Sequence, residues 1–529
     1  MPSDCISYQE SGYFIPLIVD YLNQKPQLQQ LYHRFPSADN FERQFAEKQS
    51  QFSDSSRKVL VSALERQYES IAASTATKQN IHQLLDKNTF TITTGHQLNL
   101  FTGPLYFLYK IVSAVNLTKE LKMKYPRQNF VPIYWMATED HDFEEINYFT
   151  FRGKKMRWNT TSSGPVGRLS TQGIEAVFEV FKKEMGTSEN ADVIKQLFQD
   201  AYLNHSNLAD ATRFLANELF GKYGLVILDS DDAELKKEFA PYMKAELLFQ
   251  KSHQEVQNTI AKMKLYDIQV NPREINLFYI EDHLRERIVF EKDVYKINQT
   301  SLQFSKEEIL DLLEKNPEKF SPNVILRPLY QEVILPNLCY IGGGGELAYW
   351  LELKAFFDTV AVPFPILLLR NSALLATEKQ AAKADKLGLT WHDLFRKKDE
   401  FMAQKTKEIS EFPIDLSIQK EHIKNQFHYL HVLANQTDPS FSGAVKAQEA
   451  KQLKGLDMLE KRLLKAQKRK YQDELNRMVS LQNELFPNGG LQERSANFSE
   501  FYIEYGNTLI EKLMTQLQPL ENKFTIVTL

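Results

Sequence analysis

Five carboxylates and one imidazole fall within seven consecutive residues, 139–145 (EDHDFEE). They directly follow residues 131–137 (VPIYWMA), an apolar run with the length of a strand buried on both faces. Like charges crowded at a strand end need a cation, a protonated group or a ligand beside them. We therefore expect either a general base, with His141 oriented by Asp140 or Asp142, or a site for Mg²⁺ or an ammonium group. Carboxylates that stabilise a helix N-terminus would give the same pattern without a ligand.

A second polar loop, residues 95–104 (GHQLNLFTGP), lies between a predicted strand at 89–94 and a helix that begins at Pro104. Its glycines permit close approach of a ligand to the backbone, and the unpaired N–H groups at the helix start favour an anion such as phosphate or carboxylate. His96 could act as an acid or base, or serve only as a structural hydrogen-bonding group. The other loop residues expected to contact a ligand are Gln97, Asn99, Thr102 and Gly103.

A third loop contains four consecutive glycines, residues 342–345, followed by Glu346. It lacks the Gly-Lys-Ser/Thr of a P-loop, and Leu347 occupies the final position of a G-x-G-x-x-G pattern. The glycines could cradle a ligand with their backbone, or simply let a helix pack tightly on a sheet. Two arginines in the flanking sequence could hold carboxylates or phosphates by bidentate contacts. The candidate ligand contacts in this region are Gly343, Gly344, Glu346, Arg327, Glu332, Arg370 and Asn371.

The elements that must position these loops alternate between strand and helix. Strand-like runs at 89–94, 131–137, 225–228, 338–341 and 360–369 are separated by helical segments, which is typical of an open parallel sheet with right-handed crossovers. Such sheets bind ligands beyond the carboxyl ends of their strands. We therefore predict an α/β fold with a Rossmann-like parallel sheet and all three loops at one rim.

After residue 370 the strand-like runs cease. An imperfect 3-4 spacing of leucines between residues 456 and 485 indicates a coiled coil, antiparallel to a helix at about 373–411. Residues 444–482 carry ten Lys or Arg against five Asp or Glu, a basic face that is either solvated or binds an anionic partner. The predicted units are an N-terminal helical segment that packs on the core (1–85), the α/β core (86–372), a long α-helical coiled-coil arm (373–487) and a C-terminal segment that returns to the core (488–529).

Composition excludes several classes of protein. Sixty-four basic against sixty-eight acidic side chains give a net charge of −4, which argues against a surface built to bind nucleic acid. Two cysteines among 529 residues make no disulfide framework, so we expect a cytoplasmic protein. The first residues lack the layout of a secretory signal, and no apolar run approaches the roughly twenty residues of a membrane span.

The chain resembles a known family in four motifs. They are TTGHQLNLFTGPLYFLYK (93–110), PIYWMATEDHDFEEIN (132–147), LRPLYQEVILPNLCYIGGGGELAYWLELK (326–354) and FPNGGLQER (486–494). In order and spacing they are similar to the cysteine ligases, or cysteine-adding enzymes, of bacillithiol biosynthesis, over essentially the whole chain. The resemblance implies a Rossmann-like core with a coiled-coil arm, and homodimers formed through that arm.

The resemblance also implies an activity. The family would join the carboxyl group of L-cysteine to the amine of glucosaminyl-malate, the last step in making this low-molecular-weight thiol. An unactivated carboxylate is a poor acyl donor, so ATP with Mg²⁺ is a candidate activator. The family often has glutamine at the position of His96, which favours a substrate contact over acid–base chemistry there.

From these arguments we predict an amide-forming ligase with no metal ligands, small-molecule substrates, and neither nucleic acid nor membrane as a partner. One alternative is a metal-dependent hydrolase built on residues 139–145, and another is a non-catalytic coiled-coil scaffold. The predicted catalytic residues are Asp140, His141, Asp142 and His96. The predicted substrate-binding residues are Gln97, Asn99, Thr102, Gly103, Glu144, Asn147, Arg327, Glu332, Gly343, Gly344, Glu346, Arg370 and Asn371.

Overall fold

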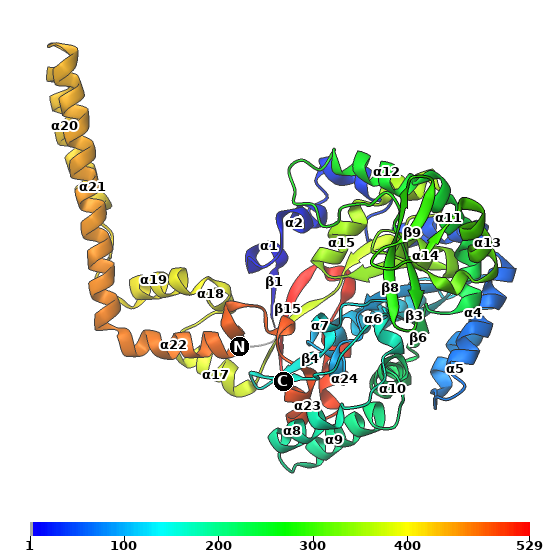
Figure 1. Ribbon diagram of the computed structural model, residues 1–529. Coiled ribbons are helices and arrows are strands. Elements are labelled where there is room, and N and C mark those ends of the chain that lie inside the picture. Colours follow the sequence, from blue (N-terminus) through cyan, green and yellow to red (C-terminus); the bar gives the residue numbers. More distant parts are fainter. Residues whose placement is uncertain (1–3) are drawn as a thin grey trace. The chain divides into compact units, whose positions relative to one another are not determined.

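The computed structural model describes residues 4–529 and separates into two compact units. The core contains residues 5–375 and 491–527, and the arm contains residues 376–490. Figure 1 shows the core as a mixture of strands and helices and the arm as helices alone. None of the helices within residues 4–529 combines the length and apolar character that a membrane crossing needs.

The centre of the core is a five-stranded sheet in the order β13-β12-β2-β3-β6, and every neighbouring pair is parallel. Helix α6 packs on β2 and β3, and apolar side chains such as Ile92 and Leu368 fill the layer beneath. The predicted Rossmann-like fold is therefore confirmed. The strand bounds are β2 Thr89–His96, β3 Asn129–Met136, β6 Val226–Asp229, β12 Asn337–Gly342 and β13 Ile366–Leu369, and α6 is Tyr106–Lys124.

The register explains why the predicted loops meet. His96 pairs with Met136 in β2 and β3, and Gly342 pairs with Leu369 in β12 and β13. The strands therefore end level with one another, and the residues that follow them leave from the same edge of the sheet. The run 360–369 forms a strand only from Ile366, because Pro363 and Pro365 cannot donate to the ladder. The helix after the glycines is likewise two short helices, α15 (Gly344–Leu351) and α16 (Lys354–Thr359).

A second, antiparallel sheet was not predicted from the sequence. Its order is β10-β9-β8-β7-β11, and β8 and β9 are joined by a tight turn in which Lys292 and Asp293 both have positive φ. Its strands mix charged and apolar residues because only one face is buried. The bounds are β7 Leu277–Glu281, β8 Leu284–Glu291, β9 Val294–Ile297, β10 Gln303–Phe304 and β11 Phe320–Pro322.

Helices and small sheets complete the core. Residues 4–7 form a strand, β1, within the segment predicted to be helical. It belongs to a three-stranded sheet in the order β1-β15-β14, in which β15 is Lys523–Thr528 and β14 is Ser372–Ala376. The small pair is β4 (Tyr148–Phe151) and β5 (Lys154–Arg157). The remaining core helices are α1 Tyr8–Ser11, α2 Pro16–Leu22, α3 Asn40–Gln51, α4 Asp54–Gln67, α5 Thr75–Gln83, α7 Phe143–Ile146, α8 Glu175–Met185, α9 Glu189–Tyr202, α10 Leu208–Phe220, α11 Ala233–Phe249, α12 Lys251–Ile260, α13 Lys306–Lys315, α14 Leu326–Ile334, α23 Phe498–Tyr505 and α24 Thr508–Gln516.

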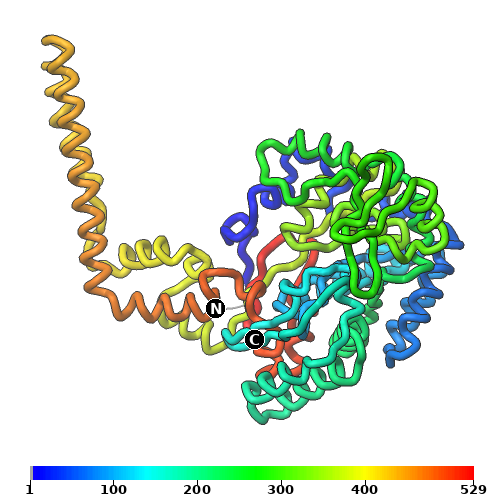
Figure 2. The backbone as a smooth tube through the Cα atoms, viewed as in Figure 1, coloured from blue at the N-terminus to red at the C-terminus, as the bar shows by residue number. Residues whose placement is uncertain are grey.

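The arm contains an antiparallel helical hairpin, α20 (Ser417–Ala434) and α21 (Pro439–Lys470), which run side by side in Figure 2. Lys420 bonds Glu460 at 2.7 Å and His431 bonds Glu449 at 2.8 Å, so the residue numbers rise on one helix as they fall on the other. The expected pairing with residues 373–411 was therefore wrong for most of α21, because a turn of four residues lets α21 fold back on α20. That segment forms α17 (Glu378–Lys386), α18 (Trp391–Phe395) and α19 (Lys398–Ile409). It does pack on α22 (Gln472–Leu485), the second half of the predicted seam, where Gln482 donates to the carbonyl of Leu394 at 2.9 Å.

Candidate functional site

A cavity of about 1070 Å³ lies over the carboxyl edge of the parallel sheet. Its lining includes Gln97 from the loop 95–104, Asp140 from the acidic loop 139–145 and Gly344 from the glycine loop 342–345. The three segments singled out in the sequence therefore meet in one place. The volume is at the upper end of the range for sites that hold one drug-sized ligand, so two small substrates could lie here together.

The structure sorts the predicted site residues into two sets. Those that line the cavity are His96, Gln97, Asp140, Arg327, Gly343, Gly344, Glu346 and Arg370. Those outside its lining are His141, Asp142, Asn99, Thr102, Gly103, Glu144, Asn147, Glu332 and Asn371.

Most of the second set have structural partners. Glu332 pairs with the buried Lys48 at 3.3 Å, and Asn371 accepts from Ser113 and donates to the carbonyl of Gln518. Glu144 pairs with Arg157. These contacts hold elements of the core together without reaching the cavity.

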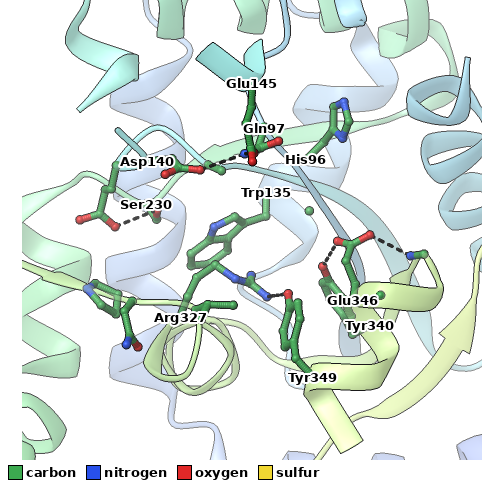
Figure 3. A pocket seen from close by; sticks show the side chains of 18 of the residues that line it. His96, Gln97, Trp135, Asp140, Glu145, Ser230, Arg327, Tyr340, Glu346 and Tyr349 are labelled. Atoms are coloured by element: carbon green, nitrogen blue, oxygen red, sulfur yellow. Dashed lines mark hydrogen bonds between the residues drawn. The ribbon is translucent and has the colours of Figure 1, made fainter. Parts of the chain in front are cut away.

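One end of the cavity is acidic. The Gln97 amide donates to Asp140 Oδ2 at 3.1 Å and to Glu145 Oε2 at 2.8 Å, so one side chain holds two carboxylates close together (Figure 3). The backbone N–H of His141 donates to the other Asp140 oxygen at 2.8 Å. Behind them Glu139 is buried and bonded to Lys236 at 2.7 Å, and burial raises the pKa of its carboxyl. Among the described residues no lysine or arginine forms an ion pair with Asp140 or Glu145, so this end suits an ammonium group.

His141 is not arranged to act as a base. Arg285 Nη1 donates to His141 Nδ1 at 2.8 Å, and since a guanidinium can only donate, Nδ1 must accept. In the neutral ring the proton therefore sits on Nε2. Burial and the Arg285 charge lower the pKa of His141. The geometry makes His141 a hydrogen-bond donor and leaves Asp140 as the carboxylate that faces the cavity.

His96 is also a neutral side chain. Burial, with a smaller contribution from Lys110, lowers its pKa to about 3. Its ring packs edge-on against Tyr106, and its Nε2 has no hydrogen-bond partner among the described residues. A base with so low a pKa accepts protons poorly at neutral pH, so His96 is better suited to contact a substrate.

The other end of the cavity is cationic. Lys110 Nζ contacts the carbonyl of Gly95 and Glu346 Oε2, each at 2.6 Å. Burial acts to raise the pKa of Glu346, but the neighbouring Lys110 holds this pKa below its usual value. Arg370 donates to Glu493 at 2.7 Å, and Arg494 also lines the cavity.

Arg327 is held differently from the other cations. It donates to Gln331 at 3.1 Å and to the Tyr349 hydroxyl at 3.3 Å, and its guanidinium lies 5.4 Å from the Tyr340 ring centroid. No carboxylate pairs with it among the described residues. In Figure 3 Arg327, Tyr349 and Glu346 lie across Trp135 from Asp140 and Glu145.

The glycine loop combines both of its expected roles. A Cβ on Gly342 would lie 2.8 Å from Leu347 and 2.9 Å from Tyr340, so this glycine is needed for packing. Gly343, Gly344 and Gly345 line the cavity, and a Cβ there would meet nothing closer than 3.4 Å. The N–H of Gly343 already donates to Glu346 at 2.8 Å, which caps α15. The open backbone surface therefore belongs to the last three glycines.

Sequence reasoning missed several lining residues. Lys110 lies one turn inside α6, where its four-residue spacing from Tyr106 could have shown that both face the loop. Glu144 was predicted to contact the substrate, but it pairs with Arg157, and its neighbour Glu145 lines the cavity. Arg273, Arg285 and Arg287 belong to the unpredicted antiparallel sheet and its preceding segment. The short run of β-branched and aromatic residues at 288–290 (IVF) was the available signal for that strand.

The segment 264–276, which brings Asn271 and Arg273 to the cavity, is held by Glu352. The fully buried Glu352 carboxyl accepts from the N–H of Gln269 at 2.8 Å, and its Oε2 has no hydrogen-bond partner among the described residues. Burial raises the pKa of Glu352 to about 7. The protonated carboxyl therefore favours the folded state at low pH, and this stabilisation is lost as the pH rises to about 7.

Replacing Glu352 with glutamine removes that titration. We expect the variant to unfold at the same temperature as the wild type at pH 5 and to be more stable by about 1–2 kcal/mol at pH 8, where only the wild-type carboxyl must ionise inside the fold. Thermal unfolding across this pH range measures the difference. A difference in stability that is the same at every pH would contradict a raised pKa of Glu352.

The carboxylates of the acidic loop turn to several different partners. Across residues 4–529 no three His, Cys, Asp or Glu side chains are grouped so as to ligate one metal ion. Glu139, Asp140 and Glu144 turn to Lys236, Gln97 and Arg157 respectively. This dispersal gives no support to the metal-dependent hydrolase.

Comparisons with known proteins cover both units. Residues 1–371 match the family model for the N-terminal Rossmann-like domain of "Bacillithiol biosynthesis BshC", and residues 373–529 match the model for its C-terminal coiled-coil domain. A protein of Flavobacterium johnsoniae named "Putative cysteine ligase BshC" is 64% identical over the whole of both chains. Proteins with the same name from Cytophaga hutchinsonii and Bacillus thuringiensis are 40% identical (97% of this chain, 96% of the relative) and 29% identical (97% and 98%).

Proposed function

The chain belongs to the bacillithiol biosynthesis BshC family, and from that premise we propose that it is a ligase that joins the carboxyl group of L-cysteine to the amine of glucosaminyl-malate. This is the last step in making bacillithiol. We place the reaction in the cytoplasm, where the cysteine thiol stays reduced.

The observation that carries the proposal is the opposed charge of the two ends of the cavity. Glucosaminyl-malate has an amine on its sugar and two carboxylates on its malate. Asp140 and Glu145 offer carboxylates to the amine, and Arg327 with Lys110 and Arg370 offers cations to the malate. The substrate then lies along the cavity in a single orientation.

Asp140 has the geometry to prepare the amine for attack. An ammonium group has no lone pair, so it must lose a proton before it can attack a carbonyl carbon. Gln97 and the backbone N–H of His141 fix both oxygens of Asp140 at the cavity wall. We assign Asp140 as the proton acceptor and Glu145 as the group that helps to hold the amine.

A binding experiment tests the site, and an assay tests the reaction. Isothermal titration calorimetry should show that the purified protein binds glucosaminyl-malate and discriminates against its N-acetylated form, which has no basic amine. Incubation with cysteine, glucosaminyl-malate and ATP-Mg²⁺ should give the thiol, detected by mass spectrometry. Equal binding of both sugar-malates would contradict the proposed acidic amine site.

We also propose that a second copy of the chain covers the arm. The hairpin of α20 and α21 has only a small buried cluster of its own near the turn, around Phe427 and Val445. Apolar side chains exposed along it form a surface that a partner would bury. They are Ile418, Tyr429, Leu430, Val432, Leu433, Phe441, Met458 and Leu459.

Changing Leu459 to lysine tests the homodimer. This side chain is 53% exposed, so the substitution should leave the hairpin folded while it puts two charges into a symmetric interface. We expect the molecular mass from light scattering to fall from that of a dimer toward that of a monomer at micromolar concentration. An unchanged mass would contradict this surface as the interface. Lys451→Met, a change at an exposed and charged residue of the same helix, serves as the control.

A further inference from the structure

The wall of the cavity that faces the sheet edge comes from the antiparallel sheet and the segment before it. It carries three arginines: Arg273 in the segment, and Arg285 and Arg287 in β8. Side chains two apart in a strand share a face, so Arg285 and Arg287 both point to the cavity. None of the three had a place in the expected site.

Arg285 is fully engaged. Its guanidinium donates to His141, to Ser321 Oγ at 3.1 Å and to the carbonyl of Pro322 at 3.2 Å, and it lies 4.1 Å from the Phe278 ring centroid. It therefore forms a fixed part of the wall. Arg287 lies opposite Phe278 in the register of β7 and β8, so it is next to this fixed group.

Arg273 and Arg287 differ from the deeper cations. Lys110 and Arg370 are each paired with a carboxylate, Glu346 and Glu493, at 2.6 and 2.7 Å. Within residues 4–529 neither Arg273 nor Arg287 has an ion pair, and both side chains are exposed at the cavity. Two unneutralised guanidinium groups on one wall attract a doubly charged anion and can hold it by bidentate hydrogen bonds.

Contacts outside the cavity fix the segment that carries Arg273. Glu352 accepts from the N–H of Gln269, and the Tyr266 hydroxyl donates to Asp20 at 2.8 Å. Asn276, near the other end, is held by the buried Glu246 and Ser252. Arg273 is thus presented by an anchored backbone, although the segment has no regular helix or strand.

We infer that Arg273 and Arg287 form a second anion subsite, which takes the phosphate of an activated cysteine, either an acyl phosphate or an acyl adenylate. This rests on the proposed function, because only amide formation calls for an activated carboxyl group. The amine nitrogen attacks the cysteinyl carbonyl carbon and the C–N bond forms. The bond between that carbon and the oxygen that bridges it to phosphorus breaks. The phosphate or AMP leaves with the electron pair. Of the two protons that the ammonium group loses, the first passes to Asp140 before the attack and the second passes to the leaving phosphate. The two arginines stabilise the charge that grows on the leaving phosphate.

Titration calorimetry of the full chain with non-reacting probes tests the subsite. The probes are inorganic phosphate, AMP and L-malate, and the variant is Arg273→Gln with Arg287→Gln. Arg43→Gln with Arg127→Gln removes the same charge at exposed positions outside the cavity. We expect the cavity variant to bind phosphate and AMP at least about 10-fold more weakly, with malate affinity changed less than about 2-fold, and the control to match the wild type.

Three results would overturn the inference: no binding of phosphate or AMP to the wild type, equal binding by the cavity variant, or an equal loss of malate binding. Tighter binding of AMP than of phosphate would identify the adenylate as the donor, and similar binding would identify the acyl phosphate. Glucosaminyl-malate is titrated in parallel. If it binds but the phosphate probes do not, the second subsite alone is wrong. If it fails to bind, the proposed function is wrong.

Discussion

Replacing Asp140 with asparagine should lower the rate of thiol formation by about 100- to 10,000-fold, the usual contribution of a positioned general base. Asparagine keeps the size of the side chain and can still accept the hydrogen bond from the backbone N–H of His141. It cannot take a proton from the amine. The rate is measured with saturating substrates, so that a loss of binding is separated from a loss of proton transfer.

Asp142→Asn is the matched control. Asp142 is two residues away and outside the cavity lining, and its side chain does not cap α7. We expect it to keep most of the activity. In cells that lack the wild-type protein, Asp142→Asn should restore the thiol and Asp140→Asn should not. If both variants restore the thiol, the result favours the non-catalytic scaffold. If neither variant is active, the catalytic role belongs to several residues of the acidic loop and not to Asp140 alone.

Replacing Lys110 with methionine should lower both the stability of the fold and the affinity for malate. Lys110 is buried and paired with Glu346, so its removal leaves a carboxylate without its cation. Breaking a buried pair in this way costs about 3–5 kcal/mol, and the lower figure fits here because Glu346 keeps some contact with solvent. Chemical denaturation should show the loss, and malate binding should fall with it.

The double variant Lys110→Met with Glu346→Gln separates the two effects. Glutamine can still accept from Gly343 and carries no charge that needs a cation, so stability should largely return. Malate affinity should not return, because the cavity still lacks the lysine. If stability and affinity recover together, Lys110 has a structural role only.

The sequence predicted the meeting of the three loops because every strand before them is buried and parallel, and parallel strands end at one edge. It could not predict which residues of each loop face inward. Glu144 and Glu145 are neighbours with the same charge, and only the fold turns one to Arg157 and the other to Gln97. The role of His141 depends on Arg285, a residue far along the chain in a strand whose mixed composition gave a weak signal.

Prediction of the arm from the sequence was limited in a similar way. The heptad-like leucines correctly indicated a coiled coil, but the identity of the partner helix depends on loop lengths. A short turn before Pro439 favours the adjacent helix over a more distant one. Leucine spacing alone does not contain that information.

The order in which the core is assembled during synthesis follows from its closing strand. Strand β15 lies between β1 and β14, Glu493 neutralises Arg370, and Asn497 donates to the carbonyls of Phe101 and Gly103. All three contacts come from residues that the ribosome makes after the entire arm. The catalytic cavity of the nascent chain therefore stays incomplete while the more than a hundred residues of the arm emerge, and a chaperone has that interval in which to protect it.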